Sequence, residues 1–277
     1  MLANLNDVLM KAKEERYGVG LFNTVSLEMA KGVLAAAEET RSPVIIGTAE
    51  VLLPYAALEE LAYFLLPMAE KATVPVVVHF DHGLTEEKVQ EALELGFTSV
   101  MYDCSTESYE ENIRRVSRMV KKAHGYRATV EAELGHVGAN TGDTEDDSIY
   151  TQPKQAKYFV EQTGADALAV AIGTAHGAYK AVPKLDIERL KEIREAVPVP
   201  LVLHGGSGLT DEDFKNCVKN GISKINIFTD INCASAKAVA ENYKPGLGMT
   251  DLMLENIRAI QKETEKKMKA FGCAGKA

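Results

Sequence analysis

The sequence predicts an α/β protein that folds as one (β/α)₈ barrel over residues 1–277. Eight short apolar runs recur along the chain, and each is followed by a stretch with helical periodicity. This alternation is typical of parallel strands covered by helices, and eight repeats in about 250 residues fit a closed barrel. No linker rich in Pro, Gly or Ser interrupts the chain, which favours one domain over two. The alternation alone also permits an open, doubly wound sheet.

The expected strands are mostly continuous β-branched runs, as is typical of strands buried on both faces. In chain order they cover 18–23, 43–49, 74–81, 98–103, 128–135, 165–173, 199–206 and 223–230. Between them lie amphipathic segments that predict helices, one of which follows Thr85 with an acidic first turn and ends at Gly96. Periodic segments before the first strand and after the last predict an extra helix at each end of the barrel. Two long connections, 135–153 and 173–185, follow strands and would lie at the catalytic end.

Charge and cysteine content narrow the function. The chain has 31 Lys and Arg against 40 Asp and Glu, a formal net charge of −9. This argues against nucleic acid and anionic membranes as partners, although an acidic protein can still bind a small anion. Four scattered cysteines predict neither a disulfide framework nor a thiolate zinc site. Without an apolar signal segment or membrane span, we expect a reduced, cytoplasmic protein.

Five of the six histidines lie at the carboxyl ends of expected strands, where a barrel places its active site. They are His79, His82, His136, His176 and His204. Catalytic zinc typically takes three protein ligands and leaves one position open. His82, His176 and His204 come from three separate βα connections and each precedes a glycine, so they can form such a set. Each one taken singly is more simply explained as a hydrogen-bonded loop histidine.

Two further patterns indicate an anionic substrate. GGSG (205–208) follows the seventh expected strand and NIFTD (226–230) ends the eighth, the positions where barrels commonly bind phosphate. Lys180 could add a cation. Carboxylates near strand ends can serve as acid, base or metal ligand; the candidates are Asp81, Asp103, Glu131, Glu133 and Glu145. The residues alone therefore indicate a metal-dependent enzyme acting on a phosphorylated small molecule.

The motifs HFDHG, EAELGHVG, AIGTAHGAY, LHGGSGL and KINIFTD, in this order, resemble those of class II, zinc-dependent fructose/tagatose-bisphosphate aldolases. The resemblance runs nearly end to end. It implies a lyase that reversibly cleaves a ketose 1,6-bisphosphate to dihydroxyacetone phosphate and an aldehyde through a zinc-stabilised enediolate. A class I enzyme would need a Schiff-base lysine, and no lysine ends an expected strand, since Lys224 begins the eighth and Lys180 lies in a loop.

The resemblance also implies a role for each site residue. His82, His176 and His204 would bind Zn²⁺, with Asp103 and Glu133 at an alternative or second cation site. Asp81 would be the acid/base for the C4 hydroxyl, and Glu145 would exchange the proton at C3. The phosphate of dihydroxyacetone phosphate would be held by Gly177, Lys180, Gly205, Gly206, Ser207, Asn226, Ile227, Phe228 and Thr229.

The aldehyde end of the substrate is less defined. Arg258 matches an arginine that binds the distal phosphate, often across a dimer, which implies a homodimer or homotetramer; a plain surface arginine is the alternative. Ser26, Ala49 and Thr106 depart from the family pattern. These departures leave open another distal aldehyde, such as that from a 2-deoxy-5-keto-gluconate phosphate. A sugar-phosphate isomerase or epimerase, and a metal-binding regulator without catalysis, are further alternatives.

Overall fold

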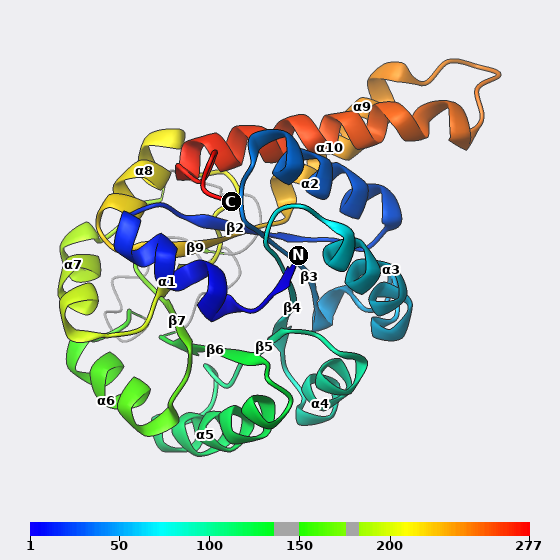
Figure 1. Ribbon diagram of the computed structural model, residues 1–277. Helices are drawn as coiled ribbons and strands as arrows, with labels where there is room; N and C mark the ends of the chain where they lie inside the picture. Colours follow the sequence, from blue (N-terminus) through cyan, green and yellow to red (C-terminus); the bar gives the residue numbers. More distant parts are fainter. Residues whose placement is uncertain (136–149, 176–182) are drawn as a thin grey trace.

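Eight parallel strands close into a barrel in the computed structural model, which describes residues 1–135, 150–175 and 183–277 (Figure 1). The barrel strands are β2 (Val19–Asn23), β3 (Val44–Ala49), β4 (Val76–Gly83), β5 (Ser99–Tyr102), β6 (Thr129–Leu134), β7 (Ala167–Val170), β8 (Leu201–Leu203) and β9 (Ile222–Ile227). Pairing of β4 with β5 and of β2 with β9 closes the ring. Every residue of these strands except His82 is buried, which explains their continuous apolar sequence. The predicted barrel is confirmed.

Helices cover the outside of the barrel. They are α2 (Leu27–Thr40), α3 (Leu58–Lys71), α4 (Glu86–Leu95), α5 (Tyr109–Gly125), α6 (Pro153–Thr163), α7 (Ile187–Ala196), α8 (Asp211–Lys219) and α9 (Thr229–Asn242), with a short 3₁₀ turn, η1 (Glu50–Leu52), after β3. Local signals set their ends as predicted. The Thr85 side chain accepts a hydrogen bond from the backbone of Lys88 at the start of α4, and Gly96 ends that helix at φ +97°.

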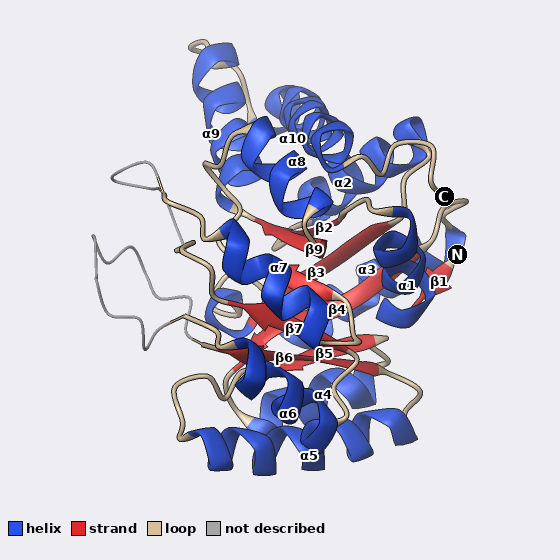
Figure 2. Cartoon of the chain, turned by 90° about the vertical axis from the view of Figure 1, so that its left-hand side faces the viewer, coloured by secondary structure: helices blue, strands red, loops and turns tan. Residues whose placement is uncertain are grey.

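The two extra helices predicted at the termini are also present. A short strand, β1 (Leu2–Ala3), pairs with β4, and α1 (Leu5–Glu15) then lies across the end of the barrel where the strands begin (Figure 2). There the backbone N–H of Leu5 donates to Thr129 Oγ1 at 3.1 Å. The other extra helix, α10 (Met249–Phe271), packs on α2 at Gly32, where an added Cβ would lie 2.7 Å from Ile260. Beyond this contact, α9 and α10 project together from the barrel (Figure 1).

Several predicted strand boundaries differ from the structure, and three of them move His82, His204 or Lys224. β4 continues to Gly83, so His82 lies on the strand and not in the following connection. β8 ends at Leu203, which places His204 in a loop. β9 begins at Ile222, so Lys224 lies inside the strand and not at its start. Among the helices of the described ranges, none is long and apolar enough to cross a membrane.

Candidate metal centre and phosphate-binding loops

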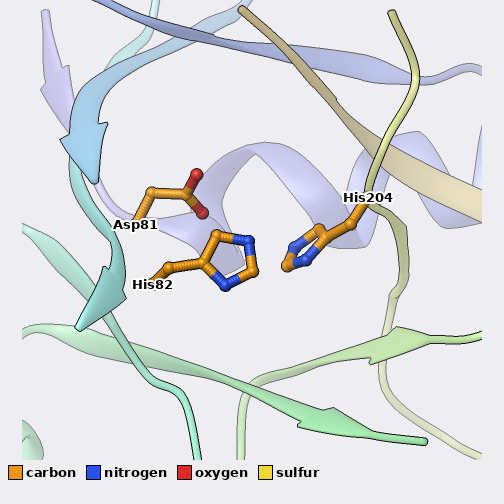
Figure 3. Close-up of side chains that lie close together, drawn as sticks. All are labelled: Asp81, His82 and His204. Carbon is orange, nitrogen blue, oxygen red and sulfur yellow. The ribbon is translucent and has the colours of Figure 1, made fainter. Parts of the chain in front are cut away.

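Asp81, His82 and His204 converge at the carboxyl end of the barrel (Figure 3). Asp81 and His82 come from the end of β4, and His204 follows β8. One potential ligand atom from each side chain lies within 4.8 Å of the others. The two imidazole rings are 4.5 Å apart at an interplanar angle of 65°. The structure thus brings together two of the three predicted zinc-binding histidines with the predicted acid/base.

His82 is oriented by its backbone and by Asp103. Its φ of +42° is unusual for a residue other than glycine, and its Nδ1 lies 2.7 Å from Asp103 Oδ2, just after β5. Burial alone would lower the pKa of His82, but the carboxylates of Asp81 and Asp103 raise it. A carboxylate on one ring nitrogen is typical of a histidine that binds a metal through the other.

His204 lies between two glutamates of β6. Its Nε2 is 2.8 Å from Glu131 Oε1, and its Nδ1 is 3.0 Å from Glu133 Oε2. Burial opposes protonation, but these carboxylates raise the pKa of His204 to about 10 in the metal-free protein. In the metal-free protein, the protonated imidazole therefore supplies the positive charge that stabilises the surrounding carboxylates. A bound metal cation would supply this positive charge in its place.

Asp81 is held by two amides, one from β2 and one from β9. Asn23 Nδ2 donates to one carboxylate oxygen at 2.8 Å, and Asn226 Nδ2 donates to the other at 2.9 Å. Although burial alone would raise the pKa of Asp81, the positive charges of His82 and Lys224 hold it well below the usual range. An ionised, fixed carboxylate can accept a proton from a bound hydroxyl group.

Lys224 connects Asp81 with His204. It is fully buried inside the barrel; its Nζ lies 2.8 Å from Glu131 Oε2 and donates to Asn226 Oδ1 at 2.7 Å. Because an ammonium group only donates hydrogen bonds, this contact turns the NH₂ of Asn226 towards Asp81. Burial would raise the pKa of Glu131, but Lys224 and then His204 lower it to about 2.

Sequence reasoning missed part of this network. It assigned no role to Asn23 and considered Lys224 only as a possible Schiff-base lysine. The spacing of Lys224 and Asn226, two residues apart, is a signal that they share one strand face. His79 is buried, with its Nδ1 2.7 Å from Ser99 Oγ. Burial and then Lys224 lower the pKa of His79 to about 3.

The described donors fit a divalent metal. The imidazoles of His82 and His204, each with a carboxylate partner, and the nearby carboxylate of Asp81 supply the nitrogen and oxygen donors that zinc uses. A second group of potential ligand atoms, from His82, Asp103 and Glu133, overlaps the first. The third expected ligand, His176, lies outside the described residues, as do Glu145, Gly177 and Lys180.

The two expected phosphate loops lie side by side. Gly205 has φ +66°, and a Cβ there would be 2.3 Å from the Ala175 carbonyl oxygen, so the close approach requires glycine. Ser207 Oγ accepts hydrogen bonds from the backbone N–H groups of Phe228, at 3.3 Å, and Asp230, at 3.4 Å. The helices α8 and α9 start directly after these loops. Backbone N–H groups at helix N-termini favour an anion.

The other expected phosphate contacts have defined positions. The backbone N–H of Gly206 donates to the carbonyl of Asn226 at 3.3 Å. Ile227 is buried, and Thr229 is the first residue of α9. Arg258, the residue expected to bind the distal phosphate, lies on α10. Its side chain is 60% exposed and forms an ion pair with Glu255.

Comparison with known proteins gives a consistent family. Residues 3–276 match the family model described as "Fructose-bisphosphate aldolase class-II". A fructose-bisphosphate aldolase from Thermus caldophilus is 41% identical over 306 residues, with 100% of both chains covered. One from Staphylococcus epidermidis is 40% identical over 286 residues, covering 100% of this chain and 99% of that protein. The solved structure of the YdjI aldolase from Escherichia coli K12 superposes with a TM-score of 0.92 at 41% identity, and both chains are fully covered.

Proposed function

Because this chain belongs to the class II fructose-bisphosphate aldolase family and is therefore a lyase, we propose that it cleaves a ketose 1,6-bisphosphate with Zn²⁺ as cofactor. The products would be dihydroxyacetone phosphate and an aldehyde, and the reaction would be reversible. The observation that carries this proposal is the convergence of Asp81, His82 and His204 at the carboxyl end of the barrel. Each of the two histidines also has a carboxylate on a ring nitrogen.

The proposed zinc ligands are His82, His204 and His176. Bound there, Zn²⁺ would act as a Lewis acid that polarises substrate oxygens and offsets developing negative charge. Asp103 fixes the ring of His82, and Glu131 fixes that of His204. Glu133 and Asp103 are also the proposed ligands of a second divalent or a monovalent cation.

Asp81 is the proposed acid/base at the C4 hydroxyl. In cleavage its carboxylate accepts the hydroxyl proton while the bond between C3 and C4 breaks, and in synthesis it returns that proton. The two amide donors, Asn23 and Asn226, hold the carboxylate in one orientation. Glu145 is the proposed group for proton exchange at C3.

The loops 205–207 and 226–229 would bind the phosphate of dihydroxyacetone phosphate, together with Gly177 and Lys180. The positive ends of α8 and α9 support this assignment. The ligand is anionic although the protein carries a net charge of −9. Local donors decide its binding, since charges beyond about 10 Å are largely screened at physiological salt.

The distal end of the substrate is set by different residues. Ala49 pairs in register with Asp81, so a methyl group lies beside the proposed acid/base on the neighbouring strand. The hydroxyl of Ser26 accepts a hydrogen bond from the backbone of Met29 at the start of α2. We propose that Arg258 of a second subunit completes the distal site in a cytoplasmic homodimer or homotetramer, since Arg258 is exposed on α10.

An assay of zinc-loaded protein tests the function. Fructose 1,6-bisphosphate, tagatose 1,6-bisphosphate and a 2-deoxy-5-keto-gluconate phosphate are supplied in parallel, and free dihydroxyacetone phosphate is measured with a coupled dehydrogenase. Release from at least one substrate is expected. Conversion of a sugar phosphate without release would instead identify an isomerase or epimerase, and binding without turnover would identify a regulator.

A further inference from the structure

Lys267 is a buried lysine on α10 that lies outside the barrel interior. Only 4% of its surface is exposed. Its Nζ lies 2.5 Å from Asp230 Oδ2 and 3.7 Å from Glu263 Oε1, and it sits 5.1 Å from the centre of the Phe214 ring. Lysine is almost never fully buried unless its charge is paired. The nearest partner, Asp230, belongs to another element, α9.

Asp230 connects Lys267 with both phosphate loops. It is the second residue of α9 and directly follows the loop 226–229. Its Oδ2 accepts a hydrogen bond from the backbone N–H of Gly208 at 3.4 Å, and its own N–H donates to Ser207 Oγ at 3.4 Å. Through this one side chain, α10 contacts the loop after β8 as well as the loop after β9.

The charge of Asp230 is unfavourable for the proposed ligand. A carboxylate at the edge of two loops that receive a phosphate dianion would repel it, and the repulsion is strong where water is excluded. Lys267 offsets that charge from the side of α10. It leaves the carboxylate oxygen in place as an acceptor for Gly208.

We propose that Lys267 is a positioning residue for phosphate binding. It neutralises Asp230 and keeps the loop 205–208 against the turn between β9 and α9, without touching the substrate. The proposal rests on the proposed function because it assumes that these loops bind the substrate phosphate. It assigns a role in the active site to α10, a helix beyond the eight βα units.

Calorimetric titration with inorganic phosphate and with dihydroxyacetone phosphate tests the proposal. For Lys267→Met, we expect both affinities to fall about tenfold and KM to rise accordingly, while kcat and zinc content stay near the wild-type values. Lys269→Met is the matched control, because Lys269 lies on the same helix with a side chain 64% exposed. Its phosphate affinity should equal that of the wild type.

Two further variants separate charge from packing. Lys267→Met combined with Asp230→Asn removes both charges but keeps an oxygen for the Gly208 N–H, and should restore most of the phosphate affinity. Lys267→Arg keeps the positive charge and should retain the wild-type phosphate affinity. Wild-type affinity in folded Lys267→Met, or a double variant as weak as the single one, would overturn the proposal.

Phosphate binding also separates this proposal from the proposed function. If the wild type binds phosphate and the variants follow the expected order while no ketose bisphosphate is cleaved, the aldolase assignment fails and the role of Lys267 stands. If cleavage is observed but the variants do not differ in phosphate affinity, the aldolase assignment stands and the proposed role of Lys267 fails.

Discussion

Replacement of Lys224 by methionine gives a prediction whose size follows from the buried charges. The substitution keeps the chain length but removes the ammonium group that lies 2.8 Å from Glu131 and donates to Asn226. Glu131 is fully buried, so its carboxylate loses its lysine partner and retains His204. Removing one partner of a buried ion pair costs about 3–5 kcal/mol.

This free energy can be converted to a melting temperature. An unfolding entropy of about 2.1 cal/mol/K per residue gives roughly 0.6 kcal/mol/K for 277 residues, so Tm should fall by about 5–9 °C. The assay is thermal unfolding of the metal-free protein, followed by circular dichroism. Adding Glu131→Gln to Lys224→Met removes the unpaired charge and keeps an acceptor for His204, so much of the lost stability should return.

The matched control is Lys191→Met, because Lys191 is an exposed lysine on α7 paired only with Glu188 in the described contacts. Its Tm should change by less than about 1 °C, since exposed pairs contribute little. If Lys224→Met melts at the wild-type temperature, the reasoning about the buried pair is refuted. The same conclusion follows if the double variant is less stable than the single one.

Three other predictions concern the site. His204→Ala should lose zinc in elemental analysis, whereas Asp81→Ala should keep it and lose about 10²–10⁴-fold in kcat; a near-normal rate would refute the role of Asp81. In the metal-free protein, the stabilisation from protonated His204 should be complete below about pH 6.5 and should be lost as the pH rises towards 10, because folding raises the pKa of His204. A denaturation midpoint that does not fall over this pH range would contradict this expectation. Gly205→Ala should weaken phosphate binding, since its Cβ would meet the Ala175 carbonyl oxygen; unchanged affinity by titration would count against the loop assignment.

Local sequence pattern was sufficient to predict the barrel and part of the site. Continuous apolar runs predict strands buried on both faces, and parallel strands bring their carboxyl ends together. His82 and His204 could therefore be placed in one site although 122 positions separate their numbers, 82 and 204. The helix boundaries at Thr85 and Gly96 follow from local capping chemistry.

The contacts between charged side chains could not be read in the same way. Asn23, Asp81 and Asn226 meet because the closed sheet orders their strands β4-β3-β2-β9, which is a property of the sheet topology and not of local sequence. Lys224 interrupts an apolar run, and only the position of β9 shows that it faces the barrel interior. Lys267 belongs to a helix whose pattern does not specify which partner its buried lysine meets.

The most direct test of the central claim is the release of dihydroxyacetone phosphate from a ketose 1,6-bisphosphate by one preparation. The preparation is assayed as zinc-loaded protein, after removal of the metal with a chelator, and after zinc is restored. We expect release, loss of release and recovery in these three states. Full activity in the zinc-stripped protein would refute metal-dependent cleavage.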